Sequence, residues 1–401
     1  MTSSPLPPTP APQPISRLAR LTGPIAGLCL SAFMFLGLIT TVYRVAAGEL
    51  DLMPTTPTWP AFLDGRVTKE IADSLANAPV PSESARVERA MSWLVIGDLG
   101  PRVRPGCTDW LFLSDEFKPH ARSDANLVAR AREVAQVKAR LDKQKTALLV
   151  VMVPDKSRVQ SDQLCNLYRP ASLDTRLTTW RDQLGAAGVH VLDLTPTLAA
   201  VSARADAQSK ESTMAFLRTD THWTQLGARA AAQAVAQQIR SLGIVARPEQ
   251  AFDAHEDKVT ARPGDLVRLA GIDTLPVSRQ PRIDLERPFR FEQRSSKDAA
   301  TGGTPPATAP TAEDLFGDSN APNIALIGTS FSRTSNFVPF LQADLDTRIV
   351  NAAMDGGDFA GAARQYFQSP AFRETPPALV IWEIPERVLQ MPSANESIAF
   401  K

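Results

Sequence analysis

In the middle of the chain, hydrophobic residues first recur at helical spacing and then form an unbroken aliphatic run. Residues 123–143 predict an amphipathic helix, because their apolar side chains recur at helical spacing. Those side chains are Leu127, Ala131, Val134 and Leu141. Residues 147–153 are continuously aliphatic up to Pro154, which is typical of a strand buried on both faces of a parallel sheet. A helix followed by such a strand predicts an α/β domain.

The same alternation continues through most of the chain. Further helices are predicted at residues 67–75, 173–184, 226–239, 338–345 and 359–367. Further strands are predicted at residues 92–96, 110–113, 189–192, 323–327, 347–350 and 379–384. Short strands that alternate with helices indicate a three-layer α/β domain with a mainly parallel sheet. We expect this domain to span residues 90–401.

One long segment departs from the alternation. Residues 243–295 combine charged residues and prolines with short apolar pieces, and we expect an irregular insertion there. Residues 296–322 are of low complexity and predict a mobile loop, because they offer too little apolar surface to offset the entropy of ordering. The predicted domain therefore carries a mobile insertion over about residues 243–322.

The first fifty residues predict a membrane anchor. Residues 21–43 contain no charged side chain, and a membrane-spanning helix needs about 20 apolar residues. Residues 1–20 are proline-rich and carry two arginines, so the positive-inside rule predicts a cytoplasmic tail and export of the rest. A cleaved signal peptide is the alternative, because small residues at 45–47 offer a cleavage site. The proline-containing residues 44–89 then predict a stalk outside the membrane.

Composition and charge exclude several classes of function. The chain has 401 residues with 43 basic and 43 acidic side chains, so it lacks the basic surplus of a dedicated nucleic-acid-binding protein. Its hydrophobic content of 43% excludes a fully disordered chain. Three cysteines are too few for a disulfide scaffold. Cys107 and Cys165 lie beyond the anchor, where an oxidising compartment allows them to pair. Two buried free thiols are the alternative, because sequence does not fix their distance.

The first candidate for chemistry is Gly328-Thr329-Ser330, directly after the predicted strand 323–327. Ligands in such sheets bind beyond the carboxyl ends of the strands. Glycine permits a sharp turn, the serine hydroxyl would project above the sheet, and its backbone N–H would be available to hold an oxyanion. The segment is not the G-x-S-x-G elbow of α/β-hydrolases, because position 332 is serine. An ordinary strand-end turn remains the alternative.

Asp220 and His222 form the second candidate. In an extended segment, residues two positions apart point to the same side. The carboxylate can then bind the imidazole Nδ1 and leave Nε2 to take a proton from a serine. Thr224 is a fitting N-cap for the predicted helix 226–239. A capping aspartate beside a solvated histidine is the alternative. No metal site is expected, because no second histidine or cysteine has ligand spacing for zinc.

The Asp-Thr-His-Trp-Thr segment at 220–224 and the Gly-Thr-Ser-Phe-Ser segment at 328–332 together resemble the alginate O-acetyltransferase family of the AlgJ and AlgX type. Asp-Trp-Leu-Phe-Leu at 109–113 and Trp-Glu-Ile-Pro-Glu-Arg at 382–387 also fit the resemblance. The family often has glycine where this chain has Asp109, so the turn before the tryptophan departs from its pattern. The resemblance implies an SGNH-hydrolase-like domain of flavodoxin-like, three-layer architecture.

The same resemblance implies the function. It implies transfer of acetyl groups to hydroxyls of an exported polysaccharide, in the periplasm and anchored by one span in the bacterial inner membrane. It also implies a membrane-bound O-acyltransferase partner that supplies acetyl, and we expect no cofactor. Ser330 would carry the acetyl group, His222 would act as general base and Asp220 would orient it. A polysaccharide acetylesterase with the same residues and a non-catalytic anchored scaffold are the alternatives.

Several neighbouring residues have two interpretations. Trp223 and Trp382 either stack on a sugar or, as we expect, pack in the core. Arg333 and Asn336 either face the site or begin a solvated helix. We expect a structural ion pair, rather than a functional site, to form among Glu383, Glu386 and Arg387.

Overall fold

The computed structural model describes residues 17–55, 57–206, 209–294, 321–392 and 397–400. The chain separates into two compact units, Met1–Met91 and Ser92–Lys401. Most of the predicted cytoplasmic tail and nearly all of the predicted mobile loop at 296–322 lie outside the described residues.

The N-terminal part of the chain is helical. Its helices are α1 (Arg17–Ala46), α2 (Trp59–Leu63), α3 (Arg66–Ala76) and α4 (Pro79–Ile96). Within α1, Gly23–Ala46 is long and apolar enough to cross a membrane. The predicted helix 67–75 is confirmed as α3, but the predicted strand 92–96 is wrong. Those residues form the last turns of α4, because nothing interrupts the helix before Gly97, which adopts a φ of 71°.

The second unit is built on a five-stranded parallel sheet with the strand order β10-β9-β11-β3-β4. The strands are β3 (Ala147–Val153), β4 (His190–Asp193), β9 (Ile324–Ile327), β10 (Val350–Asn351) and β11 (Leu379–Pro385). β11 is central and pairs with β3 along its whole length and with β9 on its other side. All five carboxyl ends therefore meet at one edge of the sheet.

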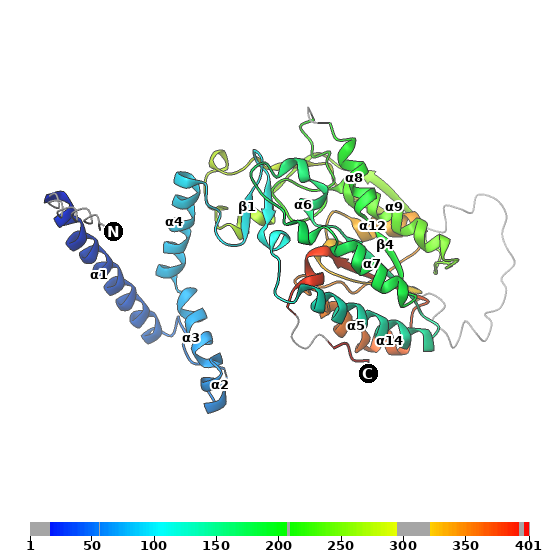
Figure 1. Cartoon of the computed structure of the whole chain (residues 1–401), viewed down its shortest axis with the longest axis horizontal. Helices are drawn as coiled ribbons and strands as arrows, with labels where there is room; N and C mark the ends of the chain where they lie inside the picture. The colour runs from blue at the N-terminus through cyan, green and yellow to red at the C-terminus, as the bar shows by residue number, and fades with distance from the viewer. Residues whose placement is uncertain (1–16, 56, 207–208, 295–320, 393–396, 401) are drawn as a thin grey trace, which may run out of the picture. The chain divides into compact units, whose positions relative to one another are not determined.

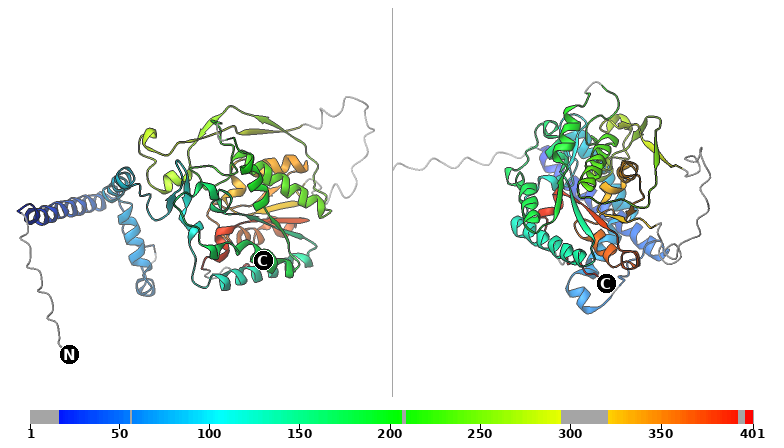
Figure 2. Two further views of the ribbon diagram at one scale, coloured as in Figure 1. Left: turned by 45° about the horizontal axis from the view of Figure 1, so that its top comes forward. Right: turned by 90° about the vertical axis from the view of Figure 1, so that its right-hand side faces the viewer.

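Helices cover both faces of this sheet (Figure 1, Figure 2). One face packs against α5 (Ser123–Lys143), α7 (Arg176–Ala186), α13 (Gly361–Phe367) and α14 (Pro370–Glu374). The other packs against α8 (Thr195–Ala203), α9 (Gln225–Ser241) and α12 (Phe337–Leu345). Strand β3 shows the cause, because its buried residues alternate between the two hydrophobic clusters. The predicted three-layer α/β domain is confirmed, and α5 and β3 have the predicted bounds.

Strand β10 is shorter than the predicted strand 347–350. Thr347 is used to end α12 instead of extending the strand. Its N–H donates to the Gln342 carbonyl at 3.1 Å, and its hydroxyl donates to the Pro248 carbonyl at 2.7 Å. These hydrogen bonds hold Thr347 at the end of α12. Pairing between β10 and β9 therefore begins only at Val350.

The segment 243–294 is ordered rather than irregular. It contains β5 (Phe252–Glu256) paired with β8 (Phe289–Gln293), β6 (Thr260–Arg262) paired with β7 (Asp284–Glu286), and α10 (Asp265–Leu269). Phe289 and Phe291 both pack against Phe340 of α12, with ring centroids 5.1 Å apart. The prediction was wrong because these short apolar pieces are buried against the α/β domain, which a local pattern does not reveal.

Strands β1 (Val103–Pro105) and β2 (Leu111–Leu113) form a hairpin. Cys107 in its loop is disulfide-bonded to Cys165, which confirms the predicted pairing. Asp109, where the family often has glycine, has a φ of 67°. Aspartate is among the few non-glycine residues that adopt this left-handed conformation without large strain. Asp109 therefore accommodates the left-handed backbone of the turn before Trp110.

Candidate active site

Ser330 lies at the carboxyl edge of the sheet, at the start of the 3-10 helix η5 (Ser330–Arg333) that follows β9. Gly328 makes the turn possible. A Cβ at this position would lie 2.5 Å from the Glu383 Oε2 and 2.8 Å from the Glu383 Cβ. Only glycine lets the backbone pass so close to β11, and that approach determines where Ser330 is presented.

The buried carboxylate of Glu383 holds the same turn from the β11 side. It accepts hydrogen bonds from the Thr329 N–H at 2.6 Å, from the Thr329 hydroxyl at 3.0 Å and from the Ser332 hydroxyl at 3.0 Å. Burial raises the pKa of Glu383, although hydrogen bonds from Thr329 and Ser332 act in the opposite direction. The residues on both sides of Ser330 are thus fixed by one carboxylate.

Glu386 forms a separate buried cluster at this edge. Its Oε1 lies 2.6 Å from the Arg158 Nη2 and 2.8 Å from the Arg169 Nη2. The predicted ion pair among Glu383, Glu386 and Arg387 is therefore wrong in its partners. Glu386 is a structural ion-pair residue, as expected, but its cations come from the segment after β3.

His222 lies between Asp220 and Ser330. Its Nδ1 is 2.6 Å from the Asp220 Oδ1, and its Nε2 is 2.7 Å from the Ser330 Oγ. The Asp220 Oδ1 also accepts the His222 backbone N–H at 2.9 Å. A carboxylate at Nδ1 requires the proton on that nitrogen, which leaves Nε2 to accept the serine proton. The structure thus brings together all three residues that sequence singled out.

Asp220 is kept in its ionised form. Burial by itself raises the pKa of a carboxyl group, but the hydrogen bond from His222, the charge of His222 and the charge of Arg262 together hold the pKa of Asp220 well below its ordinary value. Thr224 caps α9, since its hydroxyl accepts the Gly227 N–H at 3.0 Å. The segment that carries Asp220 and His222 therefore runs directly into a capped helix.

A second carboxylate, Asp265, was not identified from sequence. It accepts the Thr221 N–H at 2.8 Å and the Thr221 hydroxyl at 2.6 Å, and its Oδ2 lies 3.7 Å from the His222 Nδ1. Its own N–H donates to the Asp220 Oδ2 at 3.2 Å. No sequence signal marked it, because it belongs to the segment that was interpreted as irregular.

Lys156 was also missed, although it follows the carboxyl end of β3. Its buried ammonium donates to three backbone carbonyls, those of Leu111 at 2.7 Å, Arg218 at 2.8 Å and Asp220 at 3.0 Å. Burial lowers the pKa of Lys156 to about 8, while nearby carboxylates, Glu116 foremost, act against that shift. The side chain ties the loop that carries Asp220 to the end of the central sheet.

Aromatic packing supports His222 from behind. The Phe331 ring lies edge-on at 5.0 Å from both His222 and Trp223. Trp223 and Trp382 are 0% and 1% exposed, so the core interpretation of both is confirmed. The Arg387 guanidinium lies over the Phe331 ring at 5.4 Å. Neither tryptophan is available to stack on a sugar.

Arg333 and Asn336 have structural contacts. The Asn336 side-chain amide donates to the Phe289 carbonyl at 2.7 Å, which ties the N-cap of α12 to β8. Arg333 lies 3.3 Å from Asp355 and also donates to the Ala353 carbonyl. Both side chains hold the segment after Ser330 in place.

Among the described residues, Asp220, His222 and Asp265 place ligand atoms within 4.8 Å of one another. Two carboxylates and one imidazole are a conceivable set of metal ligands. The same atoms are engaged by hydrogen bonds to one another and to Thr221 and Ser330. This arrangement suits an acid–base group in which the carboxylates fix the imidazole.

The fold and this arrangement define a class of protein: a three-layer, SGNH-hydrolase-like α/β domain with aspartate, histidine and serine gathered at the carboxyl edge of its sheet. Residues 103–386 match the family model described as the SGNH hydrolase-like domain of the acetyltransferase AlgX. The chain belongs to this family.

Named relatives agree with that assignment. The probable alginate O-acetylase AlgJ of Pseudomonas putida is 30% identical over 361 residues, covering 89% of this chain and 88% of that protein. The corresponding Pseudomonas aeruginosa protein is 31% identical over 320 residues, covering 79% and 77%. Among solved structures, the O-acetyltransferase domain of Pseudomonas putida AlgJ superposes with a TM-score of 0.60 at 28% identity, covering 75% of this chain and 96% of that one.

Proposed function

We propose that this protein is a periplasmic O-acetyltransferase that acetylates hydroxyl groups of an exported polysaccharide. The proposal assigns one role to each of three residues. Ser330 is the nucleophile, His222 is the general base, and Asp220 orients and stabilises the imidazole. The observation that carries it is the continuous contact from the Asp220 carboxylate through the imidazole to the Ser330 hydroxyl, at 2.6 and 2.7 Å.

In the first half-reaction, the His222 Nε2 takes the Ser330 proton while Oγ attacks the carbonyl carbon of an acetyl ester or thioester. The backbone N–H of Ser330 is the proposed donor to the oxyanion. The bond between the acetyl carbon and the donor then breaks, and the donor leaves with the proton from His222. The product is an acetyl ester on Ser330.

In the second half-reaction, a sugar hydroxyl attacks this ester and gives its proton to the His222 Nε2. The bond between the acetyl carbon and Oγ breaks, and Ser330 recovers its proton from His222. Water in place of the sugar would release acetate, which is the acetylesterase alternative. The outcome depends on which acceptor reaches the acetyl-enzyme first.

The location and the partners belong to the same proposal. Gly23–Ala46 is long and apolar enough to anchor the chain, and an exported domain is consistent with the Cys107–Cys165 disulfide. The relatives in Pseudomonas are named as probable alginate O-acetylases. An acetyl donor made in the cytoplasm has to cross the membrane, so a membrane-bound O-acyltransferase is the proposed source of acetyl.

The test uses the full chain in detergent, with 4-nitrophenyl acetate as donor and oligosaccharides as acceptors. Mass spectrometry should detect acetylated oligosaccharide with the wild type, and an acetyl group on Ser330 in a trapped sample. The rate at which 4-nitrophenyl acetate is consumed should fall roughly 10³-fold in Ser330→Ala and in His222→Ala. Release of acetate with no acetylated sugar would favour the acetylesterase. Unchanged polymer acetylation in cells that carry both substitutions would favour the scaffold.

A further inference from the structure

The loop at residues 219–222, which carries the proposed base, packs against the residues that begin α10. Gly264 allows this contact, because a Cβ at its position would lie 1.9 Å from the Thr219 carbonyl oxygen. The Leu266 N–H donates to the same oxygen at 3.2 Å. Asp265, between these two residues, is therefore held directly against the loop.

The Thr221 hydroxyl links Asp265 to the imidazole. It donates to the Asp265 Oδ2 at 2.6 Å, and its oxygen lies 3.2 Å from the His222 Nδ1. An ionised carboxylate only accepts, and a hydroxyl has a single proton to give. The hydroxyl oxygen can therefore only accept from Nδ1, as the Asp220 Oδ1 does at 2.6 Å. Both acceptors keep the proton on Nδ1 and leave Nε2 to accept from Ser330.

Asp265 also acts on the other groups beside the ring. Its backbone N–H donates to the Asp220 Oδ2 at 3.2 Å, so that carboxylate is fixed on the side opposite the imidazole. The Asp265 Oδ2 lies 3.7 Å from the His222 Nδ1. The ring becomes positively charged when Nε2 takes the serine proton, and a second carboxylate at this distance stabilises that charge.

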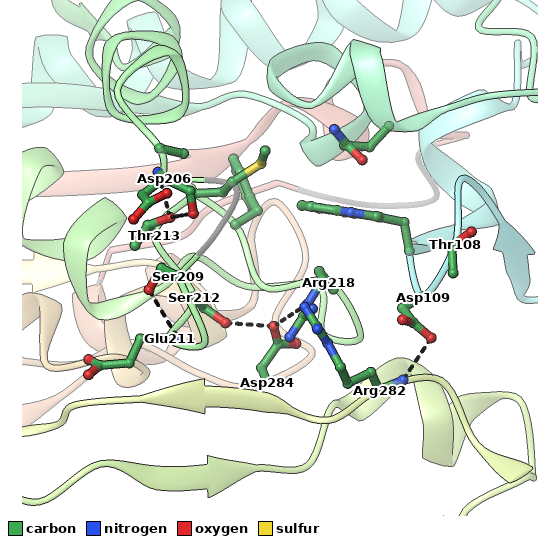
Figure 3. A pocket seen from close by; sticks show the side chains of 15 residues that line it. Thr108, Asp109, Asp206, Ser209, Glu211, Ser212, Thr213, Arg218, Arg282 and Asp284 are labelled. Atoms are coloured by element: carbon green, nitrogen blue, oxygen red, sulfur yellow. Dashed lines mark hydrogen bonds and ion pairs between the residues drawn. The ribbon is translucent and has the colours of Figure 1, made fainter. Parts of the chain in front are cut away.

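The loop itself is anchored by other side chains. The Asp284 Oδ2 accepts from both the N–H and the hydroxyl of Thr219 at 3.1 Å. Figure 3 shows the same carboxylate bonded to Ser212 and Arg218, which precede the loop. Lys156 donates to two backbone carbonyls of this stretch. The carboxylate of α10 is distinguished from these anchors by its approach to the imidazole.

We propose that Asp265 is a second positioning residue for the proposed base, His222. It acts through Thr221, whose hydroxyl it holds as an acceptor for Nδ1, and its charge stabilises the imidazolium that forms when Ser330 loses its proton. The inference rests on the proposed function, since it deepens the acid–base chemistry of the same site.

Charged groups surround the imidazole on several elements, and only two of them reach Nδ1. Those two are the carboxylates of Asp220 and Asp265, at 2.6 and 3.7 Å. The others act through the Asp220 carboxylate or carbonyl, through the Phe331 ring or through the turn beside Ser330: Arg262 with its partner Glu286, Lys156, Arg387 and Glu383. Substitution of Asp265 leaves all of them in place, so the pH dependence can report its charge.

Asp265→Asn in the full chain, in detergent, tests both parts of the role. The asparagine amide can donate where Oδ2 accepted, which turns the Thr221 proton toward Nδ1 and opposes the required tautomer. We expect kcat for 4-nitrophenyl acetate to fall roughly 10- to 100-fold at unchanged KM. An imidazole releases its proton more readily without a nearby negative charge, so the acid limb of kcat/KM should move to lower pH by about 1 unit. An acid limb that does not move overturns the proposal.

Two comparison variants separate this role from loop stability. Asp284→Asn removes a carboxylate that holds the same loop through Thr219, so it should lower the urea midpoint without moving the acid limb. Asp273→Asn, at an exposed position shortly after α10, should change neither. An equal shift of the acid limb in Asp265→Asn and Asp284→Asn overturns the proposal, because loop disturbance would then explain both.

Variants of Thr221 test the hydroxyl even if Asp265→Asn fails to fold. Thr221→Ser should keep kcat within about threefold, whereas Thr221→Val should lower it about tenfold with the acid limb in place. Equal kcat in these two variants overturns the proposal. Hydrolysis by the wild type that does not depend on Ser330 would contradict the proposed function, and this role with it. Ser330-dependent hydrolysis that all these variants retain in full would contradict this role alone.

Discussion

Glu383 of β11 accepts hydrogen bonds from both the N–H and the hydroxyl of Thr329, at 2.6 and 3.0 Å. Thr329 directly precedes Ser330, so the central strand of the sheet determines where the serine is presented. Gly328 is required for the same reason, since a Cβ there would collide with the Glu383 side chain. Strand β11 supplies no group to the proposed chemistry itself but positions Ser330, the proposed nucleophile.

Glu383→Gln tests this positioning role. Glutamine keeps the shape but offers one acceptor oxygen and an NH₂ group, so a donor on Thr329 or Ser332 loses its partner. We expect kcat for 4-nitrophenyl acetate to fall by roughly 10- to 100-fold and unfolding free energy to fall by about 1–3 kcal/mol. Steady-state kinetics and urea unfolding measure the two effects. Glu133→Gln, which removes a carboxylate on α5 that accepts the Ile398 N–H, is the control, and equal kinetics for the two variants would contradict the role.

Much of the fold could be predicted because the buried strands and helices carry strong local patterns. The bounds of α5 and β3 follow from helical spacing and from an uninterrupted aliphatic run. The predicted strand 92–96 failed for the opposite reason, because a run of four apolar residues after Ser92 does not distinguish a strand from the end of a helix. Segment 243–294 failed because its burial depends on aromatic contacts with α12.

Some residues of the candidate site could likewise be predicted from the sequence, and others could not. Asp220, His222 and Ser330 were found because each stands beside a recognisable strand end or helix start. Asp265 and Lys156 were missed because their importance lies in contacts across the fold. Lys156 binds carbonyls from three separate positions in the chain, and no spacing rule connects a lysine with backbone oxygens.

Lys156→Met should loosen the loop that carries Asp220. Methionine fills a similar volume but leaves the carbonyls of Leu111, Arg218 and Asp220 without their donor. The expected cost is on the order of 3 kcal/mol in unfolding free energy, with a fall in kcat as the imidazole loses its alignment. Lys138→Met on α5 is the control, because this lysine pairs only with the exposed Asp142 among the contacts described. Thermal unfolding measures the stability, and ester hydrolysis measures kcat. Equal losses of stability and of kcat in the two variants would contradict the proposal that Lys156 holds the loop that carries Asp220.

The disulfide between Cys107 and Cys165 should contribute substantially to stability. It closes a loop with a sequence separation of 58, and loop entropy predicts a contribution of about 4 kcal/mol. Cys107→Ser with Cys165→Ser should therefore lower the denaturant midpoint, and the slope should rise because the denatured chain without the bridge exposes more surface. Dithiothreitol should reproduce that midpoint in the wild type and have no further effect on the double variant. A midpoint that is the same with and without the bridge would refute the expectation.

Asp220→Asn should separate the electrostatic role of the carboxylate from its shape. Asparagine lacks the charge that stabilises a protonated imidazole, so we expect the rate of ester hydrolysis to fall roughly 10³-fold. The pKa of Asp220 in the folded protein lies below the ordinary value of 3.8. The carboxylate therefore contributes its stability in full above about pH 4, and that contribution is lost as pH falls through the folded pKa. Urea unfolding of wild type and variant should show a gap that is constant near neutral pH and narrows in acid. A gap that is independent of pH would mean that Asp220 is not held in its ionised form by His222 and Arg262.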